Sequence, residues 1–383
     1  MNPIRAAQSA RDALHDATRH MIDRESLMEL VLLASVAREH VLVIGPPGTA
    51  KSAAVRRIAS AVGGRYFEYL LGRFTEPSEI FGPIDLRKLR EGIVETQTDG
   101  MLPEAEVAFL DEVFLGSSAI LNTLLGLLNE RRFRRGHSEI LCPLRVCVGA
   151  SNHLPDDPAL EAFADRFLIR CFLGRVADPQ LEELLEAGAA LETMPDGRTT
   201  SLEAMDTLSN VARSMDLSTL RSALGHAIRT LRKAGVELSD RRIVKCQRLI
   251  AAAAALAGRG KPSDADLWPL VFAIPSREGQ DLAREVLRPL LARSENDTLP
   301  AAAVEASSGP RARAGRIAVE ARTRLGEDPG HSDPSAREAW ALRLEGILRE
   351  IDAGFAQESL DPELSELRAK LAATVGTVTA ATP

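Results

Sequence analysis

Short apolar runs alternate with helical patterns over the first part of the chain. Val41–Ile44 is apolar throughout and leads into a turn of glycine and proline. Comparable runs lie at 66–71, 105–110, 146–150 and 167–173. Runs without polar positions predict strands that are buried on both faces of a parallel sheet. Between them, residues 119–129 place their apolar side chains at helical spacing. Strands that alternate with helices predict an α/β domain over residues 1–177, with helices flanking a parallel sheet.

Beyond residue 173 the strand pattern stops and helical spacing takes over. Residues 178–275 predict a separate all-α domain, which Pro275 closes, and residues 276–383 predict a linker followed by a small helical module. The linker is expected at 294–313, where Ala, Ser, Gly and Pro are abundant. After Asp333-Pro334 an apolar stripe at helical spacing indicates either the core of that module or an interface. Its members are Trp340, Leu344, Ile347, Leu348, Ile351 and Phe355.

Composition narrows the class of protein without naming its chemistry. The chain has 383 residues, of which 45% are hydrophobic and 26% charged, which is average for a globular protein and excludes wholesale disorder. Its net charge of −7 argues against a surface that grips nucleic acid throughout, although it allows a local basic element. Four cysteines without a CxxC pair favour buried thiols in a reducing compartment. No apolar segment predicts a signal peptide or a membrane span, so we expect a cytoplasmic protein.

A phosphate-binding loop follows the first predicted strand. Gly45-Pro46-Pro47-Gly48-Thr49-Ala50-Lys51-Ser52 stands between Val41–Ile44 and the helical pattern of residues 53–62, the context that such a loop requires. Backbone N–H groups of the loop and the N-terminus of the following helix would face the phosphates. Lys51 would reach the β and γ phosphates, and the Ser52 hydroxyl would bind Mg²⁺. Ala50 stands where glycine usually precedes the lysine, so the backbone there must tolerate a Cβ.

Polar residues follow two further predicted strands. Asp111 and Glu112 come directly after the run at 105–110, and carboxylates at a strand tip lie at the edge where α/β proteins bind ligands. Asp111 would hold Mg²⁺, and Glu112 would orient or deprotonate the attacking water. Asn152 ends a third strand, where its neutral amide either holds the lytic water or only terminates the strand in an Asx turn.

Taken together, these motifs resemble an AAA+ P-loop ATPase of the MoxR branch. Within that branch the chain is similar to the regulatory-ATPase-variant-A (RavA) subfamily. The resemblance covers residues 15–275 and rests on these runs: Leu110-Asp111-Glu112, Ala119-Ile120-Leu121-Asn122, Leu127-Leu128-Asn129-Glu130-Arg131, Pro143-Leu144-Arg145, Ala150-Ser151-Asn152 and Asp165-Arg166-Phe167-Leu168-Ile169-Arg170. It implies an α/β nucleotide domain with an all-α lid, and ATP hydrolysis with Mg²⁺ at the junctions of a homo-oligomeric ring, most often a hexamer.

The resemblance also implies roles for two arginines and a partner. Arg166 matches the arginine finger, which reaches the γ-phosphate of a neighbouring subunit; the alternative is a surface arginine paired with Asp165. Arg241, in Ser239-Asp240-Arg241-Arg242, matches the sensor-2 arginine that ties the lid to bound phosphate, although Arg242 is a second candidate. The family typically works with a protein that carries a von Willebrand factor A domain.

Two insertions in the sequence are compatible with more than one kind of substrate. The resemblance implies a β-hairpin that projects toward the ring pore between Glu76 and Gly100, and a second insertion at 131–137 carries four arginines around Phe133. That basic insertion could grip nucleic acid, a protein client or the nucleotide of the adjacent subunit. Because the rest of the chain is acidic, we favour an ATPase that remodels or activates a protein client. The alternatives are a nucleic-acid motor or loader and a scaffold that binds ATP only to assemble.

Overall fold

The computed structural model describes residues 1–135, 138–193, 199–308, 317–318, 321–329, 334–354 and 362–379. The chain packs as two compact units. The larger unit comprises residues 1–174 and 194–307, and the smaller unit comprises residues 175–193 and 308–383. Each unit has its own core, so each is described by itself.

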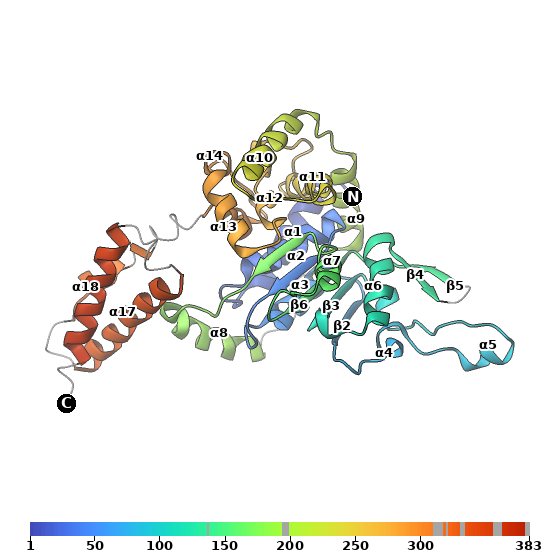
Figure 1. Ribbon diagram of the computed structural model, residues 1–383, viewed down its shortest axis with the longest axis horizontal. Coiled ribbons are helices and arrows are strands. Elements are labelled where there is room, and N and C mark those ends of the chain that lie inside the picture. Colours follow the sequence, from blue (N-terminus) through green and yellow to red (C-terminus); the bar gives the residue numbers. More distant parts are fainter. Residues whose placement is uncertain are drawn as a thin grey trace. The chain divides into compact units, whose positions relative to one another are not determined.

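A five-stranded parallel sheet forms the centre of the larger unit (Figure 1). Its strands are β1 (Val41–Ile44), β2 (Tyr66–Leu70), β3 (Val107–Asp111), β6 (Val146–Ser151) and β7 (Ile169–Phe172), in the order β2-β3-β6-β1-β7. All pairs are parallel, so every strand ends at the same carboxyl edge. The five apolar runs thus form the predicted sheet, with bounds that differ by up to two residues. Every residue of β1 is buried, which means that helices cover both faces there.

Fourteen helices in the described part of the larger unit surround this sheet and build the lid. They are α1 (Pro3–Thr18), α2 (Glu25–Ala37), α3 (Lys51–Val62), α4 (Pro77–Phe81), α5 (Leu86–Arg90), α6 (Ser118–Glu130), α7 (Pro158–Ala164), α9 (Leu202–Ser214), α10 (Arg221–Lys233), α11 (Asp240–Leu256), α12 (Pro269–Phe272), α13 (Arg277–Val286), α14 (Arg288–Leu291) and α15 (Pro300–Ser307). Helices α2 and α3 contact the strands, and the leucines of α6 join Leu42 and Ile44 in one core cluster. None of the described helices in the chain combines the length and the apolar composition needed to cross a bilayer.

Helix α15 lies where the sequence predicts a linker. Its first turn is held by Glu29 of α2, whose carboxylate accepts hydrogen bonds from the backbone N–H groups of Ala301 (3.1 Å) and Ala302 (2.7 Å). Side-chain oxygens at a helix N-terminus satisfy N–H groups that have no partner within the helix. The linker prediction is therefore wrong for residues 300–307, because the stabilising partner lies about 270 residues earlier in the chain.

The smaller unit contains α8 (Leu181–Thr193), α17 (Pro334–Gly354) and α18 (Pro362–Thr379). The predicted stripe lies on α17, where Trp340, Leu344, Ile347 and Ile351 are buried against α18; Phe355 lies outside the described residues. The stripe thus forms the core of a helical module. The structure groups residues 175–193 with this module and 277–307 with the larger unit, whereas the domain boundaries at 177 and 275 stay predictions.

The two insertions differ from each other in structure. Residues 82–100 pair as an antiparallel hairpin only at their base: a bridge joins Ile84 to Thr96, and the N–H groups of Asp85 and Gln97 donate to the carbonyls of Glu95 (2.8 Å) and Pro83 (2.9 Å). The implied β-hairpin extends no further because Asp85 caps helix α5, accepting hydrogen bonds from the N–H groups of Arg87 and Lys88. The second insertion is the hairpin of β4 (Arg132–Arg135) and β5 (Ser138–Leu141), whose residues 136–137 lie outside the described part.

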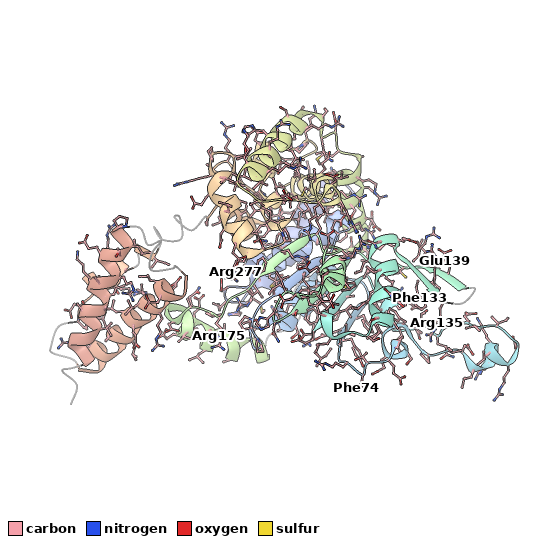
Figure 2. The ribbon with its side chains drawn as sticks, viewed as in Figure 1. Phe74, Phe133, Arg135, Glu139, Arg175 and Arg277 are labelled. Carbon is pink, nitrogen blue, oxygen red and sulfur yellow. The ribbon has the colours of Figure 1, made fainter. Side chains whose placement is uncertain are left out.

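Both insertions project from the same side of the larger unit (Figure 1). They meet at their bases, where the rings of Phe81 and Phe133 stack with centroids 5.5 Å apart. Arg135 also donates a hydrogen bond of 3.2 Å to the carbonyl of Gly82. Figure 2 labels Phe133, Arg135 and Glu139 on this hairpin. The two projections are therefore joined by packing near the core.

Candidate active site

The phosphate-binding loop follows β1 at the carboxyl edge of the sheet. Gly45 donates a backbone hydrogen bond of 3.1 Å to Ser151, and a Cβ on Gly45 would lie 3.0 Å from the Cβ of Leu173. Only glycine fits this approach to β7 without displacing the neighbouring strand. The Thr49 hydroxyl donates to the carbonyl of Pro46 (2.9 Å), which closes the loop on itself. The loop is thus fixed by the sheet on one side and by its own side chains on the other.

Ala50 adopts the left-handed backbone conformation that its position in the loop requires. Its φ of 56° and ψ of 27° lie in the left-handed region, directly before the first turn of α3. Glycine adopts this region freely, whereas a residue with a Cβ does so at a cost of about 1–2 kcal/mol. The loop therefore keeps the conformation that glycine would give it and carries some strain at Ala50.

A chain of hydrogen bonds joins three of the predicted site residues. Lys51 is buried, and its Nζ donates to the carbonyl of Gly45 (2.7 Å) and to Oδ1 of Asn152 (3.3 Å). Nδ2 of Asn152 donates in turn to Oε1 of Glu112 (2.7 Å). Lys51 begins α3 after the loop that follows β1, while Asn152 and Glu112 follow β6 and β3, and the sheet order places these three strands next to one another. The structure therefore gathers a cation, an amide and a carboxylate beside the loop.

Asp111 and Ser52 supply oxygens at the same edge. Asp111 ends β3, is half-buried, and accepts a hydrogen bond from the N–H of Glu112 on one of its carboxylate oxygens (3.0 Å). Ser52 is half-buried in the first turn of α3. A hydroxyl and a carboxylate are hard oxygen donors, which suit Mg²⁺ when it also binds the phosphates of a nucleotide. The donor set present thus fits a bound magnesium nucleotide.

Arg24 also contacts this site, although no motif in the sequence indicates it. It is buried before α2, and it donates to the carbonyls of Thr49 (Nε, 2.8 Å) and Gly174 (2.9 Å). It therefore joins the phosphate-binding loop to the segment that follows β7. The available signal is a charged residue directly ahead of the apolar helix 25–37, but sequence gives no reason to connect it with Thr49.

Arg166 lies at the opposite edge of the sheet from the phosphate-binding loop. It precedes β7, whereas the loop follows β1, so at least the length of a strand separates them. Its Nε is buried and has no hydrogen-bond partner in the part of the chain that the structure describes. Among the described residues, Asp165 forms its ion pair with Arg242 (2.6 Å) and none with Arg166. The alternative of an Asp165–Arg166 pair is therefore wrong.

Arg241 also lies at the amino edge. It donates to Oδ1 of Asn129 at the end of α6 (2.5 Å). The preceding carbonyl, of Leu128, lies 2.9 Å from Nε2 of His40, which directly precedes β1. Within one chain, the structure thus brings neither Arg241 nor Arg166 to the phosphate-binding loop.

The basic hairpin is largely neutralised within the chain. Arg132 forms an ion pair with Glu139 (2.6 Å), and Arg134 pairs with Glu130 (2.9 Å) and Glu139 (3.2 Å). Arg131 is directed inward to the carbonyls of Leu128 and Arg38, and burial lowers its pKa to about 10. Arg132 and Arg134 thus already have carboxylate partners within the chain, and Arg131 faces inward, which leaves less free positive charge for a phosphate backbone.

Comparison with known proteins is consistent with this site. Residues 8–212 match the family described as "MoxR domain in the MoxR-vWA-beta-propeller ternary systems", and residues 214–283 match the "AAA lid domain". Two uncharacterized proteins of Methanocaldococcus jannaschii are 36% and 35% identical over 252 and 249 residues. Each match covers 65% of this chain and 66% or 65% of the relative, slightly less than two thirds of its length.

Two more distant likenesses point in the same direction. Chaperone MoxR1 of Mycobacterium tuberculosis is 27% identical over 177 residues, which is 45% of this chain and 46% of that protein. A crystal structure from Cytophaga hutchinsonii, whose name assigns it as an ATPase, has a TM-score of 0.61 at 15% identity. It covers 77% of this chain and 97% of its own, and at that identity the likeness concerns the fold.

Proposed function

The chain belongs to the MoxR family of AAA+ ATPases, and from this premise we propose that it hydrolyses ATP at subunit junctions of a ring. The work of hydrolysis would remodel or activate a protein client. The observation that carries the proposal is the hydrogen-bonded chain from Lys51 through Asn152 to Glu112 beside the phosphate-binding loop. It supplies a cation for the phosphates and a carboxylate for the attacking water in one place.

Each residue of the site has a distinct task in this proposal. The loop amides and Lys51 bind the phosphates, while Ser52 and Asp111 would hold Mg²⁺. When bound, Mg²⁺ would neutralise charge that develops on the phosphate oxygens. Glu112 orients the attacking water and accepts a proton from it, and Asn152 holds Glu112 in position. Arg24 keeps the loop against β7 while the phosphates bind.

The proposal of a ring rests on the separation of the two arginines from the phosphate-binding loop, which lie at opposite edges of the sheet. Arg166 and Arg241 lie at the amino edge, away from the phosphate-binding loop of their own chain. A neighbouring subunit that brings its loop to this edge would receive Arg166 as its arginine finger. Arg241 would then act on the neighbour's phosphate as well. A closed ring makes every such junction equivalent, and the resemblance to the family favours a hexamer.

The client and the partner follow from the family and from the hairpin. The matched family is described in ternary systems with a vWA and a beta-propeller component, which supports a partner with a von Willebrand factor A domain. The ordered run of motifs between Leu110 and Arg170 favours the RavA-like subfamily within MoxR. A protein client fits better than nucleic acid, because carboxylates of the chain already occupy Arg132 and Arg134.

Two variants test the proposal directly. Lys51→Ala should abolish nucleotide binding, and Glu112→Gln should bind ATP and remain assembled without hydrolysis. ATPase assays, binding of a fluorescent nucleotide and light scattering with and without ATP measure these properties. Normal hydrolysis by Glu112→Gln would refute the assignment of the base. Negligible turnover by the unmodified protein, with ATP-dependent assembly, would instead favour the scaffold.

A separate assay tests the nucleic-acid alternative. We expect single-stranded and double-stranded DNA to leave the ATPase rate unchanged. If DNA stimulates it, replacing Arg132, Arg134 and Arg135 by Ala identifies whether the hairpin is responsible. Stimulation that this triple substitution removes would overturn the protein-client proposal.

A further inference from the structure

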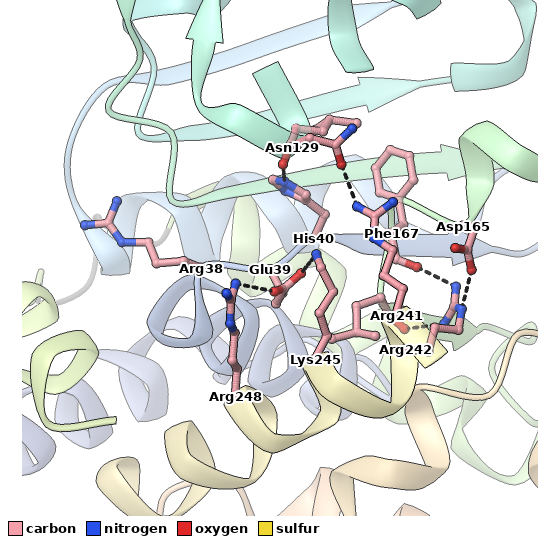
Figure 3. Close-up of polar contacts among 12 residues, drawn as sticks. Arg38, Glu39, His40, Asn129, Asp165, Phe167, Arg241, Arg242, Lys245 and Arg248 are labelled. Carbon is pink, nitrogen blue, oxygen red and sulfur yellow. Dashed lines mark hydrogen bonds and ion pairs between the residues drawn. The ribbon is translucent and has the colours of Figure 1, made fainter. Parts of the chain in front are cut away.

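Arg242 is the most extensively bonded arginine side chain of the lid helix α11. It is 2% exposed, and its guanidinium donates four hydrogen bonds. Nε bonds Oδ1 of Asp165 (2.6 Å), NH2 bonds the carbonyl of Phe167 (2.9 Å), and NH1 bonds the carbonyls of Leu168 (2.8 Å) and Ala273 (2.7 Å). Figure 3 shows Arg242 directed toward Asp165. Three of these acceptors belong to one short segment of the α/β core.

That segment carries the predicted arginine finger. Asp165 and Phe167 are the two residues on either side of Arg166, and Leu168 follows them. With three of its four hydrogen bonds to residues 165, 167 and 168, the guanidinium fixes the backbone from which the Arg166 side chain leaves. Arg166 itself has a buried Nε without a partner among the described residues. The lid residue Arg242 therefore holds the segment 165–168 in place, while Arg166 stays unpaired with the neighbouring carboxylate of Asp165.

The rest of helix α11 is anchored to the same edge of the core. Arg241 bonds Asn129, while Lys245 and Arg248 both form ion pairs with the buried carboxylate of Glu39 (Figure 3). These contacts place α11 on the core but do not touch residues 165–168. Among these four basic residues of α11, only Arg242 connects the lid helix to residues 165–168, the segment that carries Arg166.

We propose that Arg242 is a positioning residue that presents Arg166 to the nucleotide of the neighbouring subunit. This inference rests on the proposed function, in which Arg166 acts as the finger. Asp165 has a part in it as well: by pairing with Arg242, it is kept from pairing with Arg166. Only arginine can serve here, because its planar fork offers five donors in fixed directions, whereas lysine offers one nitrogen.

The first test separates hydrolysis from nucleotide binding. Arg242→Lys keeps the charge and removes the fork, so we expect kcat to fall at least tenfold while the KM for ATP changes less than threefold. The matched control is Arg248→Gln, which removes a lid–core ion pair on the same helix but leaves residues 165–168 untouched. Its kcat should stay within twofold of the unmodified protein. Equal losses of kcat in both variants would overturn the proposal.

Mixing subunits provides the decisive test, because a finger acts on the neighbour's site. An Arg242→Lys subunit keeps its own phosphate-binding loop, and a Glu112→Gln subunit keeps its own Arg166. In mixed rings, the loop of the first meets the finger of the second, so ATPase activity should exceed that of either variant alone. Arg166→Ala mixed with Glu112→Gln should show the same recovery.

The mixture of Arg166→Ala with Glu112→Gln serves as the reference, and it separates a failure of the Arg242 inference from a failure of the proposed function. Recovery with Arg166→Ala but none with Arg242→Lys would mean that Arg242 acts within its own subunit, and the inference would fail while the proposed function stands. No recovery in either mixture would remove Arg166 as a finger, and with it this inference. If Arg242→Lys does not fold, Asp165→Asn takes its place. It removes the charge of the same link but keeps an acceptor oxygen, so it should show a smaller kcat loss with the same recovery.

Discussion

The side chain of Asn152 donates a hydrogen bond of 2.7 Å to the carboxylate of Glu112. Its oxygen faces Nζ of Lys51 at 3.3 Å, and only this orientation of the amide satisfies both neighbours. The amide thus separates a cation from a carboxylate that would otherwise pair directly. We infer that it keeps Lys51 free for phosphate and Glu112 free for water.

The first prediction concerns this separation. Asn152→Ala should let Glu112 turn toward Lys51, and we expect kcat to fall by about 10², the usual loss for one preorganised hydrogen bond in an active site. Nucleotide affinity should change much less, because the loop amides remain. Steady-state ATPase assays and equilibrium nucleotide binding measure the two effects. Asn152→Gln, which retains the amide on a longer side chain, is the control, and wild-type kcat in Asn152→Ala would contradict the prediction.

The second prediction concerns Arg24. Arg24→Ala leaves the buried carbonyl of Thr49 without its donor, which costs about 1–3 kcal/mol, whereas the carbonyl of the exposed Gly174 can turn to water. We therefore expect the free energy of unfolding to fall by about 2 kcal/mol and nucleotide affinity to weaken. Urea denaturation with and without nucleotide measures both. Arg19→Ala, an exposed position in the same region, is the control, and an equal effect there would remove the specific role of Arg24.

Local patterns account for what could be predicted of the fold and the site. The run Val41–Ile44, the glycine-rich turn and Lys51 lie within eleven residues, so strand, loop and helix can be recognised together. Asp111 and Asn152 follow apolar runs, and parallel strands necessarily bring such tips to one edge. The gathering of these side chains therefore follows from the order of elements along the chain.

Long-range contacts account for what could not be predicted. Arg242 and Asp165 are 77 positions apart, and neither the lid helix nor the core segment indicates the other. The same holds for Arg24 with Gly174 and for Glu29 with α15. In each case a buried charge is satisfied by backbone groups or side chains that only the folded chain brings near. Such pairs leave no periodic pattern in the sequence.

The third prediction concerns Ala50. Ala50→Gly removes the left-handed strain of about 1–2 kcal/mol but gives the unfolded chain about 0.4–1 kcal/mol more conformational freedom. The net result should be a gain in stability of about 0.5–1 kcal/mol, with the loop unchanged in shape. Urea denaturation measures it, and Ala53→Gly, within the regular part of α3, should lose stability instead. A loss at Ala50 would show that its backbone is not strained.

The fourth prediction concerns the pH dependence of stability. Burial raises the pKa of Glu29 from 4.5 to about 8, opposed by the hydrogen bonds from the N–H groups of Ala302 and Ala301, and Glu25 and Glu305 raise it further. A carboxyl group with a raised pKa holds its proton more tightly when folded. Its contribution is fully present below about pH 4.5 and is lost as pH rises through about 8. Stability should therefore decline over this range.

Glu29→Gln isolates that contribution. Glutamine stays neutral at every pH and keeps a carbonyl oxygen for one of the α15 N–H groups. Between pH 5 and 8 the unmodified protein should therefore lose stability, while Glu29→Gln should not, so that the variant becomes the more stable of the two relative to their difference at pH 5. The change should be on the order of a few kcal/mol, since each pKa unit corresponds to about 1.4 kcal/mol. Urea denaturation across this range measures it, with Glu305→Gln as the control for a carboxylate that faces Glu29 from α15. A difference that stays constant with pH would mean that Glu29 is ionised throughout, held by the N-terminus of α15 rather than neutralised by burial.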